Sequence, residues 1–452
     1  MKLRIIEESV LFVSILKWIV LAAGIGFVVG VSTTVFLKIL AAAIAFAQDF
    51  PRYYLALPLG LFASVLIIKY MAREAQGYGT EKVIEAVHKN GGAMRAVVIP
   101  AKLCATVVTI AAGGSAGQVG PCAQIGGGLA AAFANAFRLD ANDRKKLVIC
   151  GISAGFAAVL GAPVAGAVFG LEVLFVGSLL YEVLLPSFIA GIISYHTAAV
   201  LGIDYFHYPV HLQPVFTEVF FLEIIGAGIF FGLCAILAIE SLRLTRSLFD
   251  KIPVWPPLKG IIGGIFLIVL AFLTSFRYLG LGMEIIADSL QGVKVAASAF
   301  VMKILFTAVT FASGGSGGII APLMVIGAAA GAFFAAMTGL DAATFAAVGL
   351  VSVLAGAANT PIAMSILAIE LFGKGIGAYA AIACVISFLI TGHRSIFPTQ
   401  VMAMKKSSSV EVELGQELDK VQARYKFREK SVIGTGIKMT KRIRKPGNGR
   451  KD

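Results

Sequence analysis

A glycine-rich interruption at residues 113–124 most constrains what this chain can fold into. It reads Gly-Gly-Ser-Ala-Gly-Gln-Val-Gly-Pro-Cys-Ala-Gln, and apolar, helix-like sequence precedes and follows it. The 452-residue chain is 58% hydrophobic and only 14% charged, whereas soluble globular chains carry about 25% charged residues. Its long continuous apolar runs indicate spanning helices rather than a transmembrane barrel. In a membrane, such a break is tolerated only where protein or a water-filled cavity satisfies the freed backbone groups.

The chemistry of the break favours an anion. A helix that resumes at Pro121 would point its free N–H groups and the positive end of its dipole into the break. The break also offers the Ser115 hydroxyl and the Gln118 amide, but it has no carboxylate, which a cation site would require. We therefore predict a halide-like anion as the ligand, with no metal and no cofactor. The alternative is that the glycines only allow close helix packing.

The same pattern occurs twice. Residues 102–121 align without a gap with residues 303–322, at an offset of 201, and ten of the 20 positions are identical. A second pair, residues 161–172 and 359–370, ends each time in a glutamate, Glu172 or Glu370. We interpret these two carboxylates as structural groups, each hydrogen-bonded locally at its own helix end. Two halves with matching interrupted helices indicate a transporter or channel whose binding site lies where the breaks meet.

At these residues the chain resembles the CLC family of chloride channels and chloride/proton antiporters, in its prokaryotic form without cytoplasmic regulatory domains. The resemblance covers about residues 60–402, and the family's motifs fall in order on residues 77–81, 117–121, 318–322 and 397. It implies an all-α polytopic membrane protein with an inverted two-repeat pore domain of about 18 helices of uneven length. It also implies a homodimer with one pore per subunit. The anion-binding residues that it implies are Tyr78, Gly79, Gln118, Val119, Gly120, Pro121, Gly318, Ile319, Ile320, Ala321 and Phe397.

The chain departs from the family at the residues that carry protons. The antiporters have a gating glutamate where this chain has Val119, and an internal proton-carrying glutamate where it has Val173. Valine cannot take up a proton, so the resemblance implies a passive, proton-uncoupled chloride channel. Two alternatives remain: a chloride/proton antiporter with a non-standard proton path through Glu172 or His393, and a transporter of another anion.

Substitutions within the pore motifs change the expected hydroxyl contacts. Tyr78 stands where the family has a pore serine, and Phe397 stands where it has a pore tyrosine. One hydroxyl is thereby moved from one wall of the pathway to the other. Glu81, beside the expected anion entrance, has no explanation in the resemblance.

The sequence divides into five segments. We expect an N-terminal cytoplasmic segment (1–10), two membrane repeats (11–201 and 217–402), a linker (202–216) and a basic cytoplasmic tail (403–452). The apolar run 18–47 is too long for a signal peptide, so we expect it to be a retained membrane helix. Residues 401–452 hold 14 Lys and Arg and 6 Asp and Glu, and this basic flank predicts a cytoplasmic C-terminus and contact with anionic lipid, not nucleic acid. We expect a multi-pass protein of a prokaryotic inner membrane.

Other reactive residues give no competing function. The five cysteines are scattered through apolar segments, and we expect them to be buried and to pack as small apolar residues. His207 and His211 are four apart, but Pro209 lies between them and disfavours a helical zinc pair. An intramembrane enzyme would need a catalytic partner for His196 or His393, and the sequence offers none, so we predict that the chain is not an enzyme. A transporter that has lost its activity is a further alternative.

Overall fold

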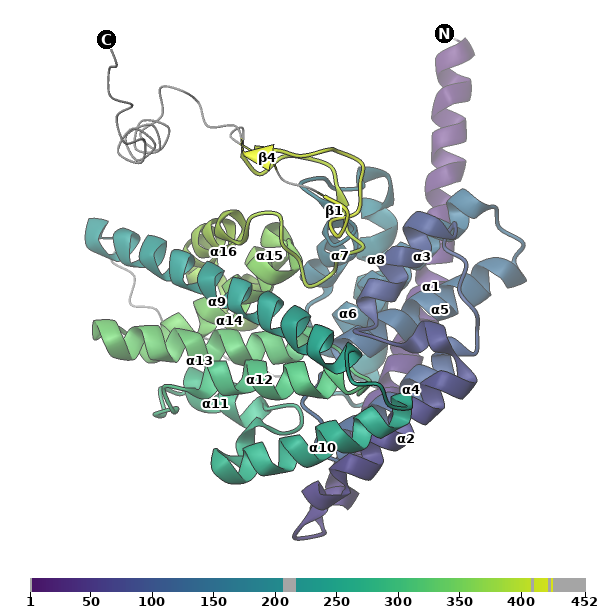
Figure 1. Ribbon diagram of the computed structural model, residues 1–452. Helices are drawn as coiled ribbons and strands as arrows, with labels where there is room; N and C mark the ends of the chain where they lie inside the picture. The colour runs from purple at the N-terminus through teal and green to yellow at the C-terminus, as the bar shows by residue number, and fades with distance from the viewer. Residues whose placement is uncertain (1, 206–216, 408–409, 422–423, 426–452) are drawn as a thin grey trace, which may run out of the picture.

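The computed structural model describes residues 2–205, 217–407, 410–421 and 424–425, and these are almost entirely helical (Figure 1). The first eight α-helices are α1 (Lys2–Gln48), α2 (Leu57–Met71), α3 (Thr80–Lys89), α4 (Val98–Ala111), α5 (Val119–Ala136), α6 (Ala141–Leu160), α7 (Pro163–Glu172) and α8 (Leu184–Val200). The next eight are α9 (Glu218–Asp250), α10 (Pro256–Leu273), α11 (Met283–Leu290), α12 (Ala299–Ala312), α13 (Ile320–Thr338), α14 (Ala342–Ala358), α15 (Pro361–Phe372) and α16 (Gly377–Thr391).

Short elements connect these helices. The 3₁₀ turns are Tyr53–Ala56, Arg73–Ala75, Tyr181–Val183, Phe276–Tyr278 and Lys374–Ile376. Strand β1 (Phe175–Val176) pairs in parallel with β2 (Val401–Met402), and β3 (Val410–Glu411) pairs antiparallel with β4 (Arg424–Tyr425). The expected all-helical fold is confirmed, with sixteen α-helices in the described residues where about eighteen were expected.

The sixteen helices form two sets of eight in the same order of long and short elements. Helix α1 packs on α8 and α5 on α6, just as α9 packs on α16 and α13 on α14. Contacts between α2 and α10 and between α7 and α15 join the two sets. The expected repeat is therefore present in three dimensions, and its halves interlock.

Seven helices in the described part of the chain are long and apolar enough to cross a membrane. Helices α4 and α12 have only 14 residues each, which at 1.5 Å per residue is about 21 Å, shorter than a hydrocarbon core of about 30 Å. Both are therefore too short to cross it on their own, and each ends at a glycine-rich break. Gly113 (φ +105°) and Gly114 turn the chain after α4, and Gly314 (φ +97°) does so after α12, a backbone conformation that glycine adopts without strain.

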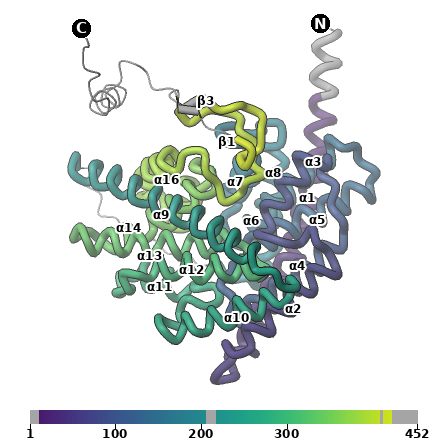
Figure 2. Tube along the Cα trace, viewed as in Figure 1, coloured from purple at the N-terminus to yellow at the C-terminus, as the bar shows by residue number. Residues whose placement is uncertain are grey.

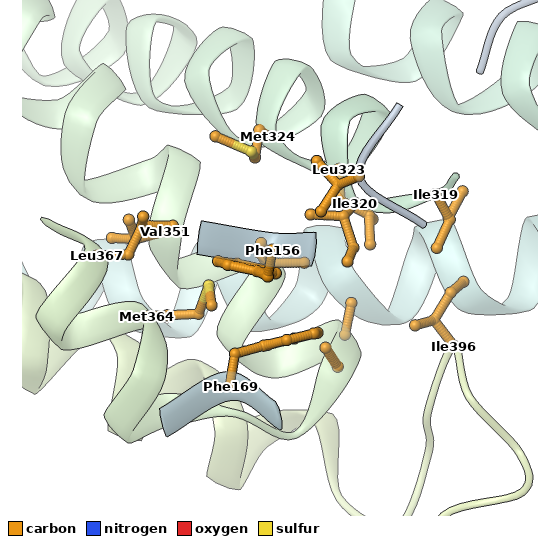
Figure 3. Close-up of a cluster of buried hydrophobic side chains, with 14 of the residues drawn as sticks. Phe156, Phe169, Ile319, Ile320, Leu323, Met324, Val351, Met364, Leu367 and Ile396 are labelled. Carbon is orange, nitrogen blue, oxygen red and sulfur yellow. The ribbon is translucent and has the colours of Figure 1, made fainter. Parts of the chain in front are cut away.

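The apolar core lies where the two halves meet. Figure 3 shows side chains of both halves in one cluster, with Phe156 and Phe169 from the first half near Val351, Met364 and Leu367 from the second. The two phenylalanine rings are stacked with centroids 4.2 Å apart. The buried apolar cluster is therefore continuous across the two halves.

The segment after residue 402 is partly folded onto the helices, unlike the simple tail expected from residue 403. Figure 2 shows it folding back over the end of the molecule near α7 and α16. Lys406 Nζ donates to Asn359 Oδ1 (2.6 Å) and to the Phe388 carbonyl (2.7 Å), and Glu417 forms an ion pair with Lys89 of α3 (2.8 Å). Its apolar side chains Val412 and Leu418 are buried with Phe388.

Other expectations have mixed outcomes. The polar segment 2–10 is the first part of helix α1, which also contains the apolar run 18–47 and packs against α6 and α8. Four cysteines are buried as expected, but Cys104 is exposed on α4, so that expectation is wrong for this residue. Most of the expected linker, residues 206–216, lies outside the described residues, and the segment boundaries stay predictions.

Candidate anion pathway

The two glycine-rich breaks are joined to each other. The Gly117 N–H donates to the Gly318 carbonyl at 2.7 Å, and the Gly318 N–H donates to the Gly117 carbonyl at 2.7 Å, which makes an antiparallel bridge. A Cβ atom on Gly117 would lie 2.7 Å from the Ala321 Cβ, so a larger residue cannot make this approach. The antiparallel sense is what an inverted repeat requires.

Serine and threonine side chains near the bridge form hydrogen bonds between the two halves. The Ser115 N–H donates to Thr310 Oγ1 (3.1 Å), and its hydroxyl bonds the Thr307 hydroxyl (2.9 Å). Ser316 repeats both contacts with Thr109 (3.0 Å) and Thr106 (3.2 Å). These contacts explain why the repeat preserves threonine and serine as well as glycine. The Ser115 hydroxyl, expected to be an anion donor, is already engaged.

Four of the expected site residues meet at the bridge through their backbones. The position of a Cβ on Gly120 lies 2.1 Å from the Tyr78 carbonyl oxygen and 2.8 Å from the Gly318 Cα. A Cβ on Gly79 would lie 2.4 Å from the Gly120 carbonyl oxygen. Tyr78, Gly79, Gly120 and Gly318 therefore form one closely packed layer that no side chain could enter.

Helices α5 and α13 both begin at this layer, at Val119 and Ile320. The N–H groups of a helix's first turn have no acceptor within the helix, and the dipole makes this end partly positive. Pro121 and Pro322 each occupy the third position of their helix, where a missing N–H costs no intrahelical bond. Each N-terminus attracts an anion by about 0.3–2 kcal/mol.

Two hollows reach this layer. The larger one, about 690 Å³, has Gln118, Val119 and Ala321 among its lining residues, together with the charged Lys38 and Glu284. Val119 is 1% exposed.

The smaller hollow, about 140 Å³, is lined by Gly77, Tyr78 and Glu81 and by Phe311 and Arg246. The Tyr78 and Phe311 rings meet edge to face at 4.8 Å. Because the Tyr78 backbone packs on Gly120 and Val119 follows the bridge, we conclude that a thin layer of backbone separates the two hollows.

Three further expected site residues do not line either hollow. Ile319, Ile320 and Phe397 are buried, and neither hollow counts them among its described lining residues. The side chains of Ile319 and Ile320 lie in the apolar cluster, with Ile396 nearby (Figure 3). The Phe397 N–H donates to Ser395 Oγ (2.9 Å). Ile319 and Ile320 can therefore offer an anion only backbone N–H groups.

The paired glutamates are bonded to the opposite half, not locally as expected. The carboxylate of Glu172, at the end of α7, accepts the N–H groups of Ile362 (3.0 Å) and Ala363 (2.8 Å) at the start of α15. Glu370, at the end of α15, accepts those of Val164 (2.9 Å) and Ala165 (2.8 Å) at the start of α7. Each half thus caps a helix of the other.

The internal proton-path position, Val173, is fully buried beside one of these caps. Its carbonyl accepts a hydrogen bond from Gln400 Nε2 (2.8 Å). His393, the other proposed proton carrier, follows α16 and lines neither of the two hollows that reach the bridge. His196 is exposed on α8, and His207 and His211 lie outside the described residues.

The structure shows a second pair of equivalent segments that the sequence comparison missed. Residues 77–81 (Gly-Tyr-Gly-Thr-Glu) correspond to residues 280–284 (Gly-Leu-Gly-Met-Glu) at an offset of 203. Gly79 (φ +84°) and Gly282 (φ +76°) are the N-caps of α3 and α11. The Gly-x-Gly-x-Glu spacing was the available signal.

Two buried lysines hold these equivalent segments. Lys102 Nζ donates to the carbonyls of Ala75 (3.2 Å) and Gly77 (2.7 Å). Lys303 Nζ donates to those of Tyr278 (3.1 Å) and Gly280 (2.9 Å). Both lysine side chains are fully buried, which explains why the repeat preserves a lysine inside apolar sequence. Among the described residues, no cluster of three or more His, Cys, Asp or Glu could hold a metal ion.

Comparison with known proteins finds relatives that are named for chloride or fluoride transport. A family model described as voltage gated chloride channel matches residues 59–392. A "Chloride/fluoride channel protein" of Pseudomonas syringae pv. tomato is 33% identical over 418 residues, which cover 90% of this chain and 91% of that protein. An "H(+)/Cl(-) exchange transporter ClcA" of Klebsiella pneumoniae is 26% identical, over 72% of this chain and 74% of its own.

Solved structures are similar in fold. The crystal structure of a CLC-type fluoride/proton antiporter superimposes with a TM-score of 0.81 at 29% identity, over 85% of this chain and 98% of that one. A slow cyanobacterial Cl⁻/H⁺ antiporter superimposes with a TM-score of 0.72 at 20% identity, over 83% and 94% of the two chains.

Proposed function

The chain belongs to the voltage-gated chloride channel (CLC) family, and from that premise we propose that it conducts chloride or a similar anion passively, without proton coupling. Its membership makes it a multi-pass membrane protein that transports anions. The observation that carries the passive mechanism is Val119, an uncharged side chain that lines the larger hollow at the start of α5.

The anion would be held at the layer between the two hollows. Free N–H groups at the starts of α5 and α13 supply donors near Val119, Gly120, Ile319 and Ile320, and Tyr78 adds a hydroxyl from the smaller hollow. Several such weak donors can offset partial loss of hydration without holding the ion too tightly to leave.

The absence of a proton carrier at the motif positions supports a passive mechanism. Val119 and Val173 cannot titrate. Both oxygens of Glu172 accept backbone N–H groups of α15, so release of this carboxylate would uncap a helix of the other half. His393 lines neither of the two hollows that reach the bridge.

The names of the relatives favour a second candidate, a coupled or fluoride-selective transporter. One relative is named for chloride and fluoride, and the structure with a TM-score of 0.81 is titled a fluoride/proton antiporter.

We further propose a homodimer in a prokaryotic inner membrane with the C-terminus in the cytoplasm. The relatives named above are channels and transporters, not enzymes.

The test is anion flux from liposomes of phosphatidylethanolamine and phosphatidylglycerol that contain the purified protein. We expect chloride efflux down its gradient, with a rate that an imposed proton gradient changes only through pH itself. Chloride movement against its gradient, driven by protons, would show that the protein is an antiporter. Replacement of chloride by fluoride in the same assay separates the two candidate anions, and no flux of either anion from well-folded protein would favour an inactive relic.

A further inference from the structure

Glu81 lies at the smaller hollow, and we propose that it is an electrostatic gate: its charged carboxylate holds anions back from Tyr78, and its protonation admits them. The inference rests on the proposed function and assigns a role to an acidic residue that the anion pathway itself does not require. Nothing in the helix geometry demands a buried carboxylate beside an anion.

The position of Glu81 is the first observation. It is the second residue of α3, directly after the Tyr78–Gly79 segment that packs on Gly120. Its side chain is 9% exposed and lines the smaller hollow together with Tyr78 and Arg246. An anion that reaches the layer from this side therefore passes the carboxylate.

The lack of a fixed partner is the second observation. Within the described residues the Glu81 carboxylate makes no hydrogen bond and no ion pair, although its backbone carbonyl accepts the Thr399 hydroxyl (3.2 Å). By contrast, the buried Glu172 carboxylate accepts two backbone N–H groups. A buried carboxylate without bonds is free to change rotamer and protonation state.

The charges that act on Glu81 come from three elements. Lys82 and Glu85 of α3 are bonded to each other (2.8 Å), and Lys102 of α4 is committed to two carbonyl oxygens. Arg246 and Asp250 of α9 line the same hollow as Glu81. Burial raises the pKa of the Glu81 carboxyl, and Lys82 and Arg246 only partly oppose this, so protonation begins at a higher pH than for an exposed glutamate.

The equivalent residue of the other half separates this role from helix capping. Glu284 is also the second residue of its helix, α11, but its side chain is 81% exposed and lies 3.8 Å from Arg277. An acidic residue at a helix N-terminus is favourable wherever it points, so capping explains both glutamates. It does not explain why Glu81 is buried beside Tyr78.

The experiment compares Glu81→Gln with a control outside both hollows, the exposed Glu182→Gln, in liposomes loaded with potassium chloride. We expect wild-type efflux to rise about threefold to tenfold as the pH on both sides falls from about 7.5 to about 5, because protonation removes the repelling charge. Glu81→Gln should be fast at both pH values, and Glu182→Gln should follow the wild type.

The outcomes distinguish this inference from the proposed function. Glu81→Gln efflux with the wild-type rate and pH profile would overturn the gate. If Glu81→Gln does not fold, Arg246→Gln serves instead: loss of this cation should move half-activation to higher pH, and an unchanged midpoint would overturn the gate. Absence of any wild-type anion flux would refute the proposed function and the gate together. Proton-driven uphill flux would refute only the passive mechanism, because the two glutamine variants can still be compared.

Discussion

The two hollows of the anion pathway are bordered by equivalent segments, residues 77–81 and 280–284, but their side chains differ. The smaller hollow has Tyr78 and a buried Glu81, whereas the larger has Leu281 and an exposed Glu284 that pairs with Arg277. The lysines and glycines that shape the two backbones are the same. The repeat thus fixes the backbone on both sides, and a few side chains make one hollow small, with the buried Glu81, and the other large, with Val119 and the exposed Glu284.

The largest expected effect comes from an acid in the larger hollow. Val119→Glu should lower chloride efflux at about pH 7.5 by about tenfold or more, because a buried negative charge beside the helix N-termini competes with the anion. Acidic pH should restore efflux. Val119→Gln, of similar size but uncharged, is the control, and an equal loss in both variants or a Val119→Glu rate that ignores pH would argue against this placement of the pathway.

Removal of one hydroxyl from the smaller hollow should have the next largest effect. Tyr78→Phe should weaken the apparent affinity for chloride by about threefold to tenfold, since a hydrogen bond to a charged group contributes about 1.5–3 kcal/mol and part of it is replaced by water. The measurement is efflux against chloride concentration. Tyr205→Phe is the control at the larger hollow, because the Tyr205 hydroxyl is already bonded to the Ala158 carbonyl (2.8 Å). Equal effects of both variants would mean that Tyr78 has no special role.

Glu172 and Glu370, which each cap a helix of the opposite half, test whether the two halves contribute equally to stability. Glu172→Gln and Glu370→Gln should each destabilise the protein by about 1–3 kcal/mol, because the glutamine amide has one acceptor oxygen, so one of the two backbone N–H groups loses its partner and the other bond loses its charge assistance. Thermal unfolding in detergent measures this, with the exposed Glu182→Gln as the control. A loss confined to one of the two variants would show that the halves share geometry but not stability.

The smallest effect concerns the C-terminal segment, whose Glu417 pairs with Lys89 of α3, the helix that begins beside the smaller hollow. Hydrogen bonds from Lys420 and Lys89 lower the pKa of the Glu417 carboxyl. A lowered folded-state pKa means that the contact stabilises the attachment above the ordinary glutamate pKa of about 4.3 and is lost as the pH falls further.

We expect Glu417→Gln to loosen residues 412–421 at neutral pH by less than about 1 kcal/mol. Hydrogen exchange of this segment measures the change, and Glu413→Gln is the control. Wild-type exchange that is equally protected at neutral and strongly acidic pH would contradict the assigned role of the ion pair.

The sequence predicted the features that backbone geometry dictates. A break inside the membrane needs glycine for the turn, hydroxyls for the exposed backbone and proline in the first helical turn, so residues 102–121 and 303–322 kept enough identity to be aligned. The shorter pair at residues 77–81 and 280–284 was missed because its matching residues are two glycines and one glutamate.

Features that depend on distant partners could not be predicted. The positions of Glu172 and Glu370 at helix ends were visible, but their acceptance of N–H groups from the opposite half depends on how α7 and α15 pack. The folded start of the tail depends on strand pairing between Val176 and Met402, more than 200 residues apart. The roles of the expected anion-binding residues stay predictions until flux is measured.

The bridge between Gly117 and Gly318 has a consequence for how the protein is made. The two glycines are 201 positions apart, and the Gly113 carbonyl also accepts the N–H of Gly280, so the first break is synthesised and inserted long before its cross-half backbone partners exist. Until then its polar groups must be covered by lipid headgroups, water or the insertion machinery, because bare backbone in hydrocarbon costs several kcal/mol per group. The nascent first half is therefore incomplete until the second break at residues 314–322 has been synthesised, and the pathway cannot form before then.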